Sequence, residues 1–87
     1  MTEDLRTTVE REPLRALVAE TLELPAAEVT DTAHFSDDLD VDSLMALELS
    51  VALEKRYGIT MEDFDLKNAT TLVQVHRLVE DKLGQGG

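Results

Sequence analysis

The chain has 87 residues, with eight Lys or Arg against 19 Asp or Glu, so its net charge is −11. A chain of this size makes one domain that buries only about 60–65% of its unfolded surface, which leaves little room for a catalytic cleft together with a substrate pocket. The negative charge argues against nucleic acid and anionic membranes as partners and favours proteins with basic docking patches.

The residue inventory excludes several further classes of protein. There is no cysteine, so disulfides and thiolate zinc sites are excluded and the polypeptide offers no thiol of its own. No apolar run approaches the ~20 residues of a membrane span. The acidic start, Met1 to Asp4, is unlike a signal peptide, so we expect a cytoplasmic protein.

The first expected helix runs from about Glu10 to Leu22, preceded by a flexible segment over residues 1 to about 9. Pro13 suits a first helical turn, and Pro25 ends the pattern because the residue before proline is disfavoured in the helical region. The apolar residues recur at helical spacing: Leu14, Leu17, Val18 and Leu22.

Residues 25–42 form a long connection with scattered apolar residues and no sustained period. A short turn is expected around Ala26 to Val29, and Phe35 is the expected anchor on the helices. Loops longer than ~12–15 residues in a compact domain are usually functional or disordered.

The second expected helix runs from Ser43 to about Tyr57 and carries two apolar stripes. One stripe, assigned to the core, comprises Ala46, Leu49, Leu53 and Tyr57. The other comprises Leu44, Leu47 and Val51. Periodicity leaves two options open: burial on both sides, or an exposed second stripe that docks a partner. Lys55 and Arg56 suit a helix C-terminus, and Gly58 provides a stop.

A short helix is expected from about Glu62 to Leu66, with Met61 and Phe64 available for the core. Thr70 or Thr71 caps a final helix that runs to about Lys82, and residues 84–87 are expected to be flexible. Its apolar face comprises Leu72, Val75, Leu78 and Val79. The sequence therefore predicts an all-α fold: a small four-helix bundle of three longer helices and one short helix, with a long loop between the first two.

The stretch from Asp38 to Leu44 alternates acidic and apolar residues and then changes to a helical pattern. Asp42 and Ser43 can each cap the helix that starts there, because their side-chain oxygens accept unpaired amides of a first turn. Taken alone, this spacing indicates a capped helix.

Asp42-Ser43-Leu44, after Asp38-Leu39 and before Glu48-Leu49, resembles the attachment site of acyl carrier proteins. The resemblance extends from about Leu14 to Leu83 and includes Phe35, the segment 52–54 and Thr70-Thr71. Asp40 departs from it, because the family usually has glycine there, and Asp adopts a positive φ only at some cost.

The resemblance implies one acyl carrier domain over residues 1–87 that is not an enzyme. A phosphopantetheinyl transferase would add 4′-phosphopantetheine from coenzyme A to Ser43, and the arm's thiol would hold acyl groups as thioesters. A ketosynthase, an acyltransferase and other acyl-processing enzymes would be partners of the monomeric carrier. It also implies a docking helix after the serine; with its flanking acidic residues, the docking set is Asp42, Leu44, Leu47, Glu48, Val51 and Glu54. Asp42 before the serine resembles acyl carriers rather than peptidyl carriers, where histidine is common. The helix that Gly58 ends, its basic Lys55-Arg56 pair and the free-standing length resemble a discrete polyketide-type carrier more than one of fatty acid synthesis.

Three other readings compete with the carrier. Asp38, Asp40 and Asp42 match the start of a calcium loop, but Ser43 and Leu49 stand where such a loop needs glycine and glutamate, so no metal site is expected. A hydrolase with Ser43 as nucleophile would need a base, and the spacing of His34 and His76 pairs neither with it. An unmodified acidic interaction module remains open and differs from a carrier in having no adduct on Ser43.

Overall fold

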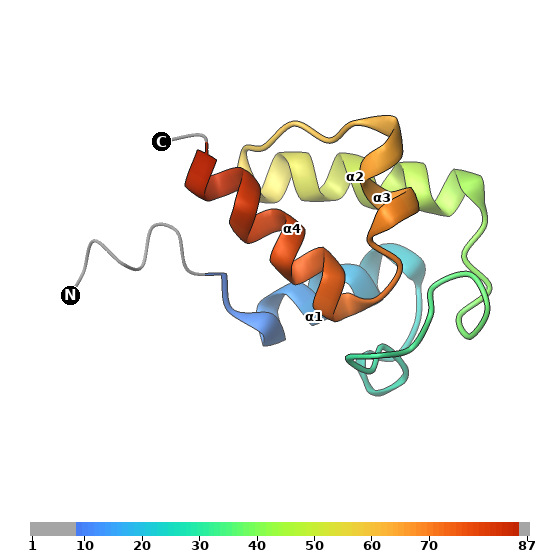
Figure 1. Ribbon diagram of the computed structural model, residues 1–87. Coiled ribbons are helices and arrows are strands. Elements are labelled where there is room, and N and C mark those ends of the chain that lie inside the picture. Colours follow the sequence, from blue (N-terminus) through green and yellow to red (C-terminus); the bar gives the residue numbers. More distant parts are fainter. Residues whose placement is uncertain (1–8, 86–87) are drawn as a thin grey trace.

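The computed structural model describes residues 9–85, and its regular elements are all helical (Figure 1). Their order is α1 (Arg11–Leu22), the short 3-10 helix η2 (Ala26–Glu28), α2 (Ser43–Tyr57), α3 (Asp63–Asn68) and α4 (Leu72–Gln85). Within the described residues there is no strand. The prediction of an all-α fold with three longer helices, one short helix and a long first connection is confirmed.

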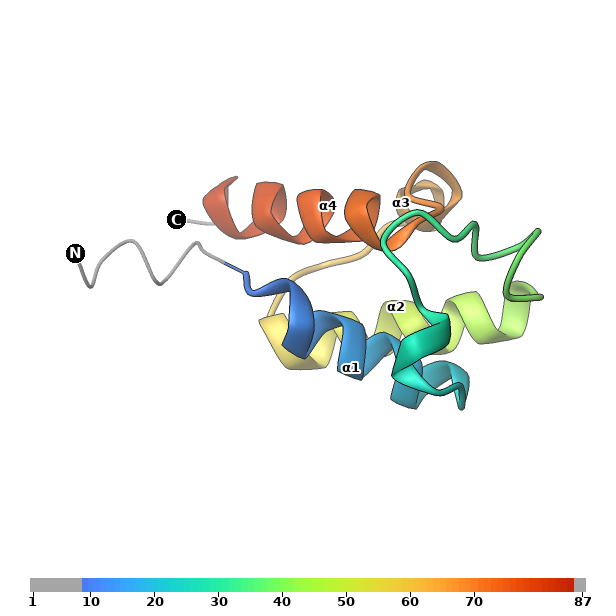
Figure 2. The same cartoon turned by 90° about the horizontal axis from the view of Figure 1, so that it is seen from below.

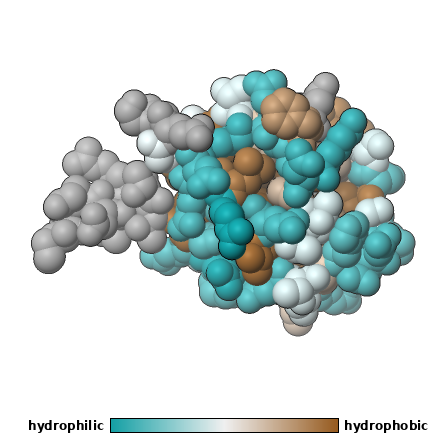
Figure 3. All heavy atoms as spheres, in the orientation of Figure 1, coloured by the Kyte–Doolittle hydropathy of each residue, from teal (hydrophilic) through white to brown (hydrophobic). Residues whose placement is uncertain are grey.

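The helices form two layers around one core. Figure 2 shows α1 and α2 together on one side and α4 with α3 on the other. The space between them is filled by apolar side chains of α1, α2 and α4, among them Leu14, Val18, Leu49, Leu53, Leu72, Val75 and Val79. Hydrophilic residues cover most of the face drawn in Figure 3, and apolar ones show between them.

The long connection is fastened to the bundle at several points. The Arg15 guanidinium on α1 contacts Asp31 Oδ1 at 2.6 Å and also donates to the carbonyl of Val29. The amide of Phe35 donates to the carbonyl of Thr70 at 2.9 Å, just before α4. Phe35 is buried, as predicted for an anchor. The loop that leads to α2 is therefore held in place by both layers.

The structure differs from the expectation of flexible ends at Val9 and at residues 84–85. Val9 is buried in the core, where its carbonyl contacts His76 Nε2 on α4. The last helix continues past Lys82 to Gln85, because the packing of Leu83 against the core stabilises a further helical turn. Residues 1–8 and 86–87 lie outside the described part of the chain.

The expectation that Phe64 joins the core is wrong. Its side chain is 59% exposed, whereas the neighbouring Asp65 is buried. Asp65 Oδ2 accepts a hydrogen bond from the amide of Glu62 at 2.7 Å and meets Lys82 Nζ on α4 at 3.0 Å. Successive helical residues point about 100° apart, so turning Asp65 inward turns Phe64 outward. Met61, as predicted, packs partly buried against the core.

Replacing Asp65 with asparagine is expected to lower stability at neutral pH by about 1–3 kcal/mol, because the inward-facing cation Lys82 loses its charged partner. Burial raises the pKa of the Asp65 carboxyl, but the Glu62 amide and Lys82 outweigh this and leave the pKa below its usual value. A depressed folded-state pKa stabilises the fold above the unfolded-state pKa of about 4, and this contribution is lost as the pH falls through the folded-state pKa.

Thermal unfolding of wild type and Asp65→Asn between pH 7 and pH 2 measures this contribution. The melting temperature of the variant should start lower and fall less on acidification. Asp81→Asn, which changes an exposed carboxylate of α4, is the matched control and should follow the wild type. Parallel curves for wild type and Asp65→Asn would show that the Asp65–Lys82 pair has no net effect on stability.

Candidate functional site

A tight turn leads the loop into α2. The amide of Val41 donates to the carbonyl of Phe35 at 2.9 Å, and Asp38 Oδ2 accepts from the amide of His34 at 2.7 Å. Asp40, which lies between Asp38 and Val41, has a φ of 57°, in the left-handed region. Aspartate is one of the few residues other than glycine that adopt this region. Asp40 thus takes the positive φ that glycine would tolerate at this position.

Asp42 caps α2, and Ser43 is its first residue. Asp42 Oδ1 accepts the amide of Met45 at 2.9 Å, so of the two candidate caps Asp42 fills the position. Ser43 is exposed at the helix N-terminus, where free amides and the positive end of the helix dipole lie. Because the cap is Asp42, the hydroxyl of Ser43 is not required to start the helix.

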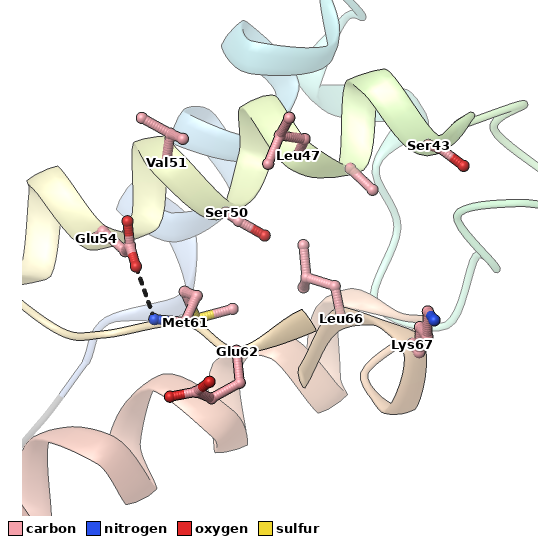
Figure 4. A pocket seen from close by; sticks show the side chains of 10 residues that line it. Ser43, Leu47, Ser50, Val51, Glu54, Met61, Glu62, Leu66 and Lys67 are labelled. Atoms are coloured by element: carbon pink, nitrogen blue, oxygen red, sulfur yellow. Dashed lines mark hydrogen bonds between the residues drawn. The ribbon is translucent and has the colours of Figure 1, made fainter. Parts of the chain in front are cut away.

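A groove of about 390 Å³ separates α2 from α3, and Ser43 lies at one end of it (Figure 4). Its apolar wall is formed by Ala46, Leu47, Val51, Met61 and Leu66. Lys67 lies at the same end as Ser43, on the opposite wall, whereas Glu54 and Met61 lie at the other end. The site is therefore an open groove with one apolar wall, also lined by Ser50, Glu54 and Glu62, and with the Ser43 hydroxyl at its mouth.

A second hollow of about 260 Å³ adjoins the groove and reaches the long loop. It is lined by Phe35, Val41 and Leu49, and it shares Ala46, Leu66 and Lys67 with the groove. A chain entering past Ser43 therefore meets apolar surface in both hollows.

The second apolar stripe of α2 is exposed. Leu44 is 63%, Leu47 60% and Val51 40% accessible, whereas Leu49 and Leu53 are completely enclosed in the core. Of the two options that periodicity left open, burial on both sides is wrong. Three large apolar side chains on one helix face form a surface suited to a partner.

The acidic residues around this stripe have different roles. Glu48 is exposed on α2. Asp42 caps the helix, and Glu54 Oε2 accepts the amide of Met61 at 2.8 Å, which braces the segment between α2 and α3. This hydrogen bond could not be predicted from the sequence, because it depends on the path of the chain beyond Gly58.

The histidines do not complete a hydrolase. His34 lies in the loop, where its Nδ1 accepts the amide of Asp37, and His76, on α4, contacts the carbonyl of Val9. Neither lines the groove beside Ser43.

Within residues 9–85, no three His, Asp or Glu side chains gather closely enough for a metal site. No helix in this part of the chain has the length and apolarity to cross a bilayer.

Residues 12–79 match a family model described as the phosphopantetheine attachment site. The chain is also 50% identical over 84 residues to the polyketide-8 synthase acyl carrier protein 2 of Streptomyces avermitilis, which covers 97% of each chain. The chain belongs to the acyl carrier protein family. This acyl carrier protein is also 38% identical over 72 residues to an acyl carrier protein of Petrotoga mobilis, covering 83% of its own length and 85% of that chain.

Membership confirms the resemblance drawn from the motif and gives the cofactor, 4′-phosphopantetheine. Acyl carrier proteins are non-catalytic and work with acyl-processing enzymes. The exposed hydroxyl, the open groove and the exposed apolar stripe of α2 are consistent with that work.

Proposed function

We propose that Ser43 carries the 4′-phosphopantetheine arm of this acyl carrier protein. The observation that carries the proposal is the placing of an exposed serine at the first residue of α2, at the mouth of the groove between α2 and α3. Asp42 supplies the helix cap, so esterification of Ser43 leaves the cap intact. The hydroxyl, its exposure and the groove beside it fit the arm.

Attachment requires a phosphodiester bond between Ser43 Oγ and the arm. Ser43 Oγ attacks the phosphorus that bears the pantetheine in coenzyme A, the pyrophosphate bond breaks, and adenosine 3′,5′-bisphosphate leaves. The serine proton passes to a base, and neither histidine lies at the groove to accept it. We propose that a phosphopantetheinyl transferase supplies the base, together with the magnesium ion that the resemblance to acyl carrier proteins implies. Once attached, the arm supplies the thiol on which acyl groups are carried.

We propose further that this carrier serves a multi-enzyme pathway of polyketide synthesis. Half of the aligned residues are shared with a polyketide synthase carrier over nearly the whole of both chains, against 38% and 37% for relatives named only acyl carrier protein, from Petrotoga mobilis and Helicobacter pylori. A ketosynthase and an acyltransferase are the expected partners. Loading the protein beside candidate synthases and identifying the thioester cargo by mass spectrometry would distinguish polyketide from fatty acid synthesis.

Incubation with coenzyme A, magnesium and a broad-specificity transferase tests the attachment site. One phosphopantetheine per chain is expected by intact mass. The chain has no Lys or Arg between Arg15 and Lys55, so trypsin leaves one long peptide that also contains Ser36 and Ser50. Fragmentation of this peptide must place the adduct on Ser43. An adduct elsewhere, or none with any transferase, would refute the assignment.

Docking is proposed to use Leu44, Leu47 and Val51 for apolar contact and the acidic residues Asp42, Glu48 and Glu54 for steering. Glu48→Lys should slow transferase loading, most strongly at low salt, because charges at an interface rim act chiefly on association rate and are screened by salt. Loading rates measured across a range of salt concentrations check this.

The matched control is Glu20→Lys, which reverses an exposed charge on α1 and should leave loading unchanged. Glu54→Lys should differ from Glu48→Lys in also lowering the melting temperature, since it removes the acceptor of the Met61 amide. Equal loading rates of the folded Glu48→Lys variant and the wild type at every salt concentration would rule out steering by Glu48.

A further inference from the structure

Lys67 occupies an unusual place among the charges of the molecule. Of the described residues that line the groove or the adjoining hollow, it is the one with a positive charge, and it lines both. It lies on α3, across the groove mouth from Ser43 (Figure 4). No Lys or Arg occurs in the sequence from Ala16 to Glu54, a span that contains that serine.

A phosphodiester on Ser43 would place a negative charge where acidic residues already gather. Asp38, Asp40 and Asp42 precede the serine in the chain, and their charges oppose a further anion. The amides and dipole of α2 favour it, but a helix N-terminus alone sets no direction for the rest of the arm. A cation on the opposite wall supplies both attraction and direction.

Resting on the attachment proposed above, we propose that Lys67 binds the phosphodiester of the arm and directs the pantetheine chain along the groove between α2 and α3. Lys67 is a positioning residue in this role. The tether limits the phosphate to the surroundings of Ser43 Oγ, so the flexible side chain of Lys67 has to reach only the groove mouth. Beyond it the walls include the apolar side chains of Leu66, Leu47 and Met61.

The fixed position of α3 determines the direction in which Lys67 would guide the arm. α3 is fixed to α4 by the buried contact of Asp65 with Lys82. Lys67 therefore extends from a wall whose position is fixed, while Lys67 itself is exposed. An exposed ion pair of this kind is weak and sensitive to salt. The arm is thus expected to exchange between the groove and solvent, and Lys67 shifts this equilibrium towards the groove.

The test compares holo forms of the wild type, Lys67→Met, Lys67→Arg and the control Lys55→Met, which removes an exposed cation at the other end of α2. Loading is first verified by intact mass. Isotope-filtered NOEs between the unlabelled arm and the labelled protein, and the ³¹P shift of the phosphodiester, are then recorded at low and high salt.

At low salt the wild type should show NOEs from the arm to Lys67 and Leu66. In Lys67→Met the NOEs to Leu66 should be lost and the ³¹P resonance should move. Lys67→Arg should keep both signals and Lys55→Met should match the wild type, whereas high salt should bring the wild type towards Lys67→Met.

Equal ³¹P shifts and equal arm NOEs in wild type and Lys67→Met would overturn the role of Lys67, with attachment at Ser43 intact. So would loss of the arm NOEs in Lys55→Met as well, since that would indicate a general charge effect. If the arm could be added to Ser43 neither in the wild type nor in the variants, the attachment itself would be refuted.

Discussion

Replacing Ser43 with alanine is expected to abolish phosphopantetheine loading completely while leaving the fold unchanged. Ser43 Oγ is the proposed nucleophile, and alanine has no atom that could form the phosphodiester. The helix should persist because Asp42, not Ser43, accepts the amide of Met45. Intact mass after incubation with coenzyme A and transferase measures loading, and thermal unfolding followed by circular dichroism checks the fold.

Ser50→Ala is the matched control. Ser50 lies on α2 in the wall of the same groove, and Figure 4 shows its hydroxyl directed into that space. This variant should be loaded like the wild type. If the Ser43→Ala protein still gained the adduct, or if Ser50→Ala lost it, the attachment site would have been assigned to the wrong residue.

Replacing Leu53 with alanine is expected to remove much of the stability of the domain. Leu53 is fully buried where α2 faces the core, and truncating such a leucine costs about 2–5 kcal/mol through lost burial and the cavity left behind. The total free energy of unfolding of a domain of this size is about 5 kcal/mol or somewhat more. The variant should therefore be largely unfolded at moderate temperature or in low urea.

Leu47→Ala provides the comparison on the same helix. Leu47 is 60% exposed, so the same truncation there should change the free energy of unfolding by no more than about 0.5 kcal/mol. Urea titrations of both variants measure the difference. A cost below 1 kcal/mol for Leu53→Ala would mean that the core relaxes around the missing side chain far more than a close-packed interior allows.

The helices that have clear end signals were predicted closely from the sequence. The expected bounds of α2, from Ser43 to about Tyr57, agree with the structure, because Asp42 caps its start and Gly58 takes the left-handed conformation after its end. α1 starts one residue later than expected. The end of α4 was missed, because the sequence beyond Lys82 reads as flexible while Leu83 contacts the core.

The site was predictable where it is local and not where it depends on the chain path. The motif around Ser43 is contiguous, so its place at a helix start followed from the sequence. Periodicity alone could not decide which stripe of α2 faces the core. The contacts of Glu54 and Asp65 and the proposed role of Lys67 depend on how α3 lies against α2 and α4, and α3 is too short to show a reliable apolar face.

The long loop and the start of α4 are joined by two backbone hydrogen bonds, from the amide of Phe35 to Thr70 and from the amide of Val73 to Asp31. These bonds join the same two segments, which are far apart in the sequence, so we expect them to break together. In the language of hydrogen exchange, the loop and the first turn of α4 belong to one cooperative unit. A partner bound at α2 therefore meets a loop that already has a fixed conformation beside Ser43. Any enzyme that needs the loop opened must also loosen the layer formed by α3 and α4.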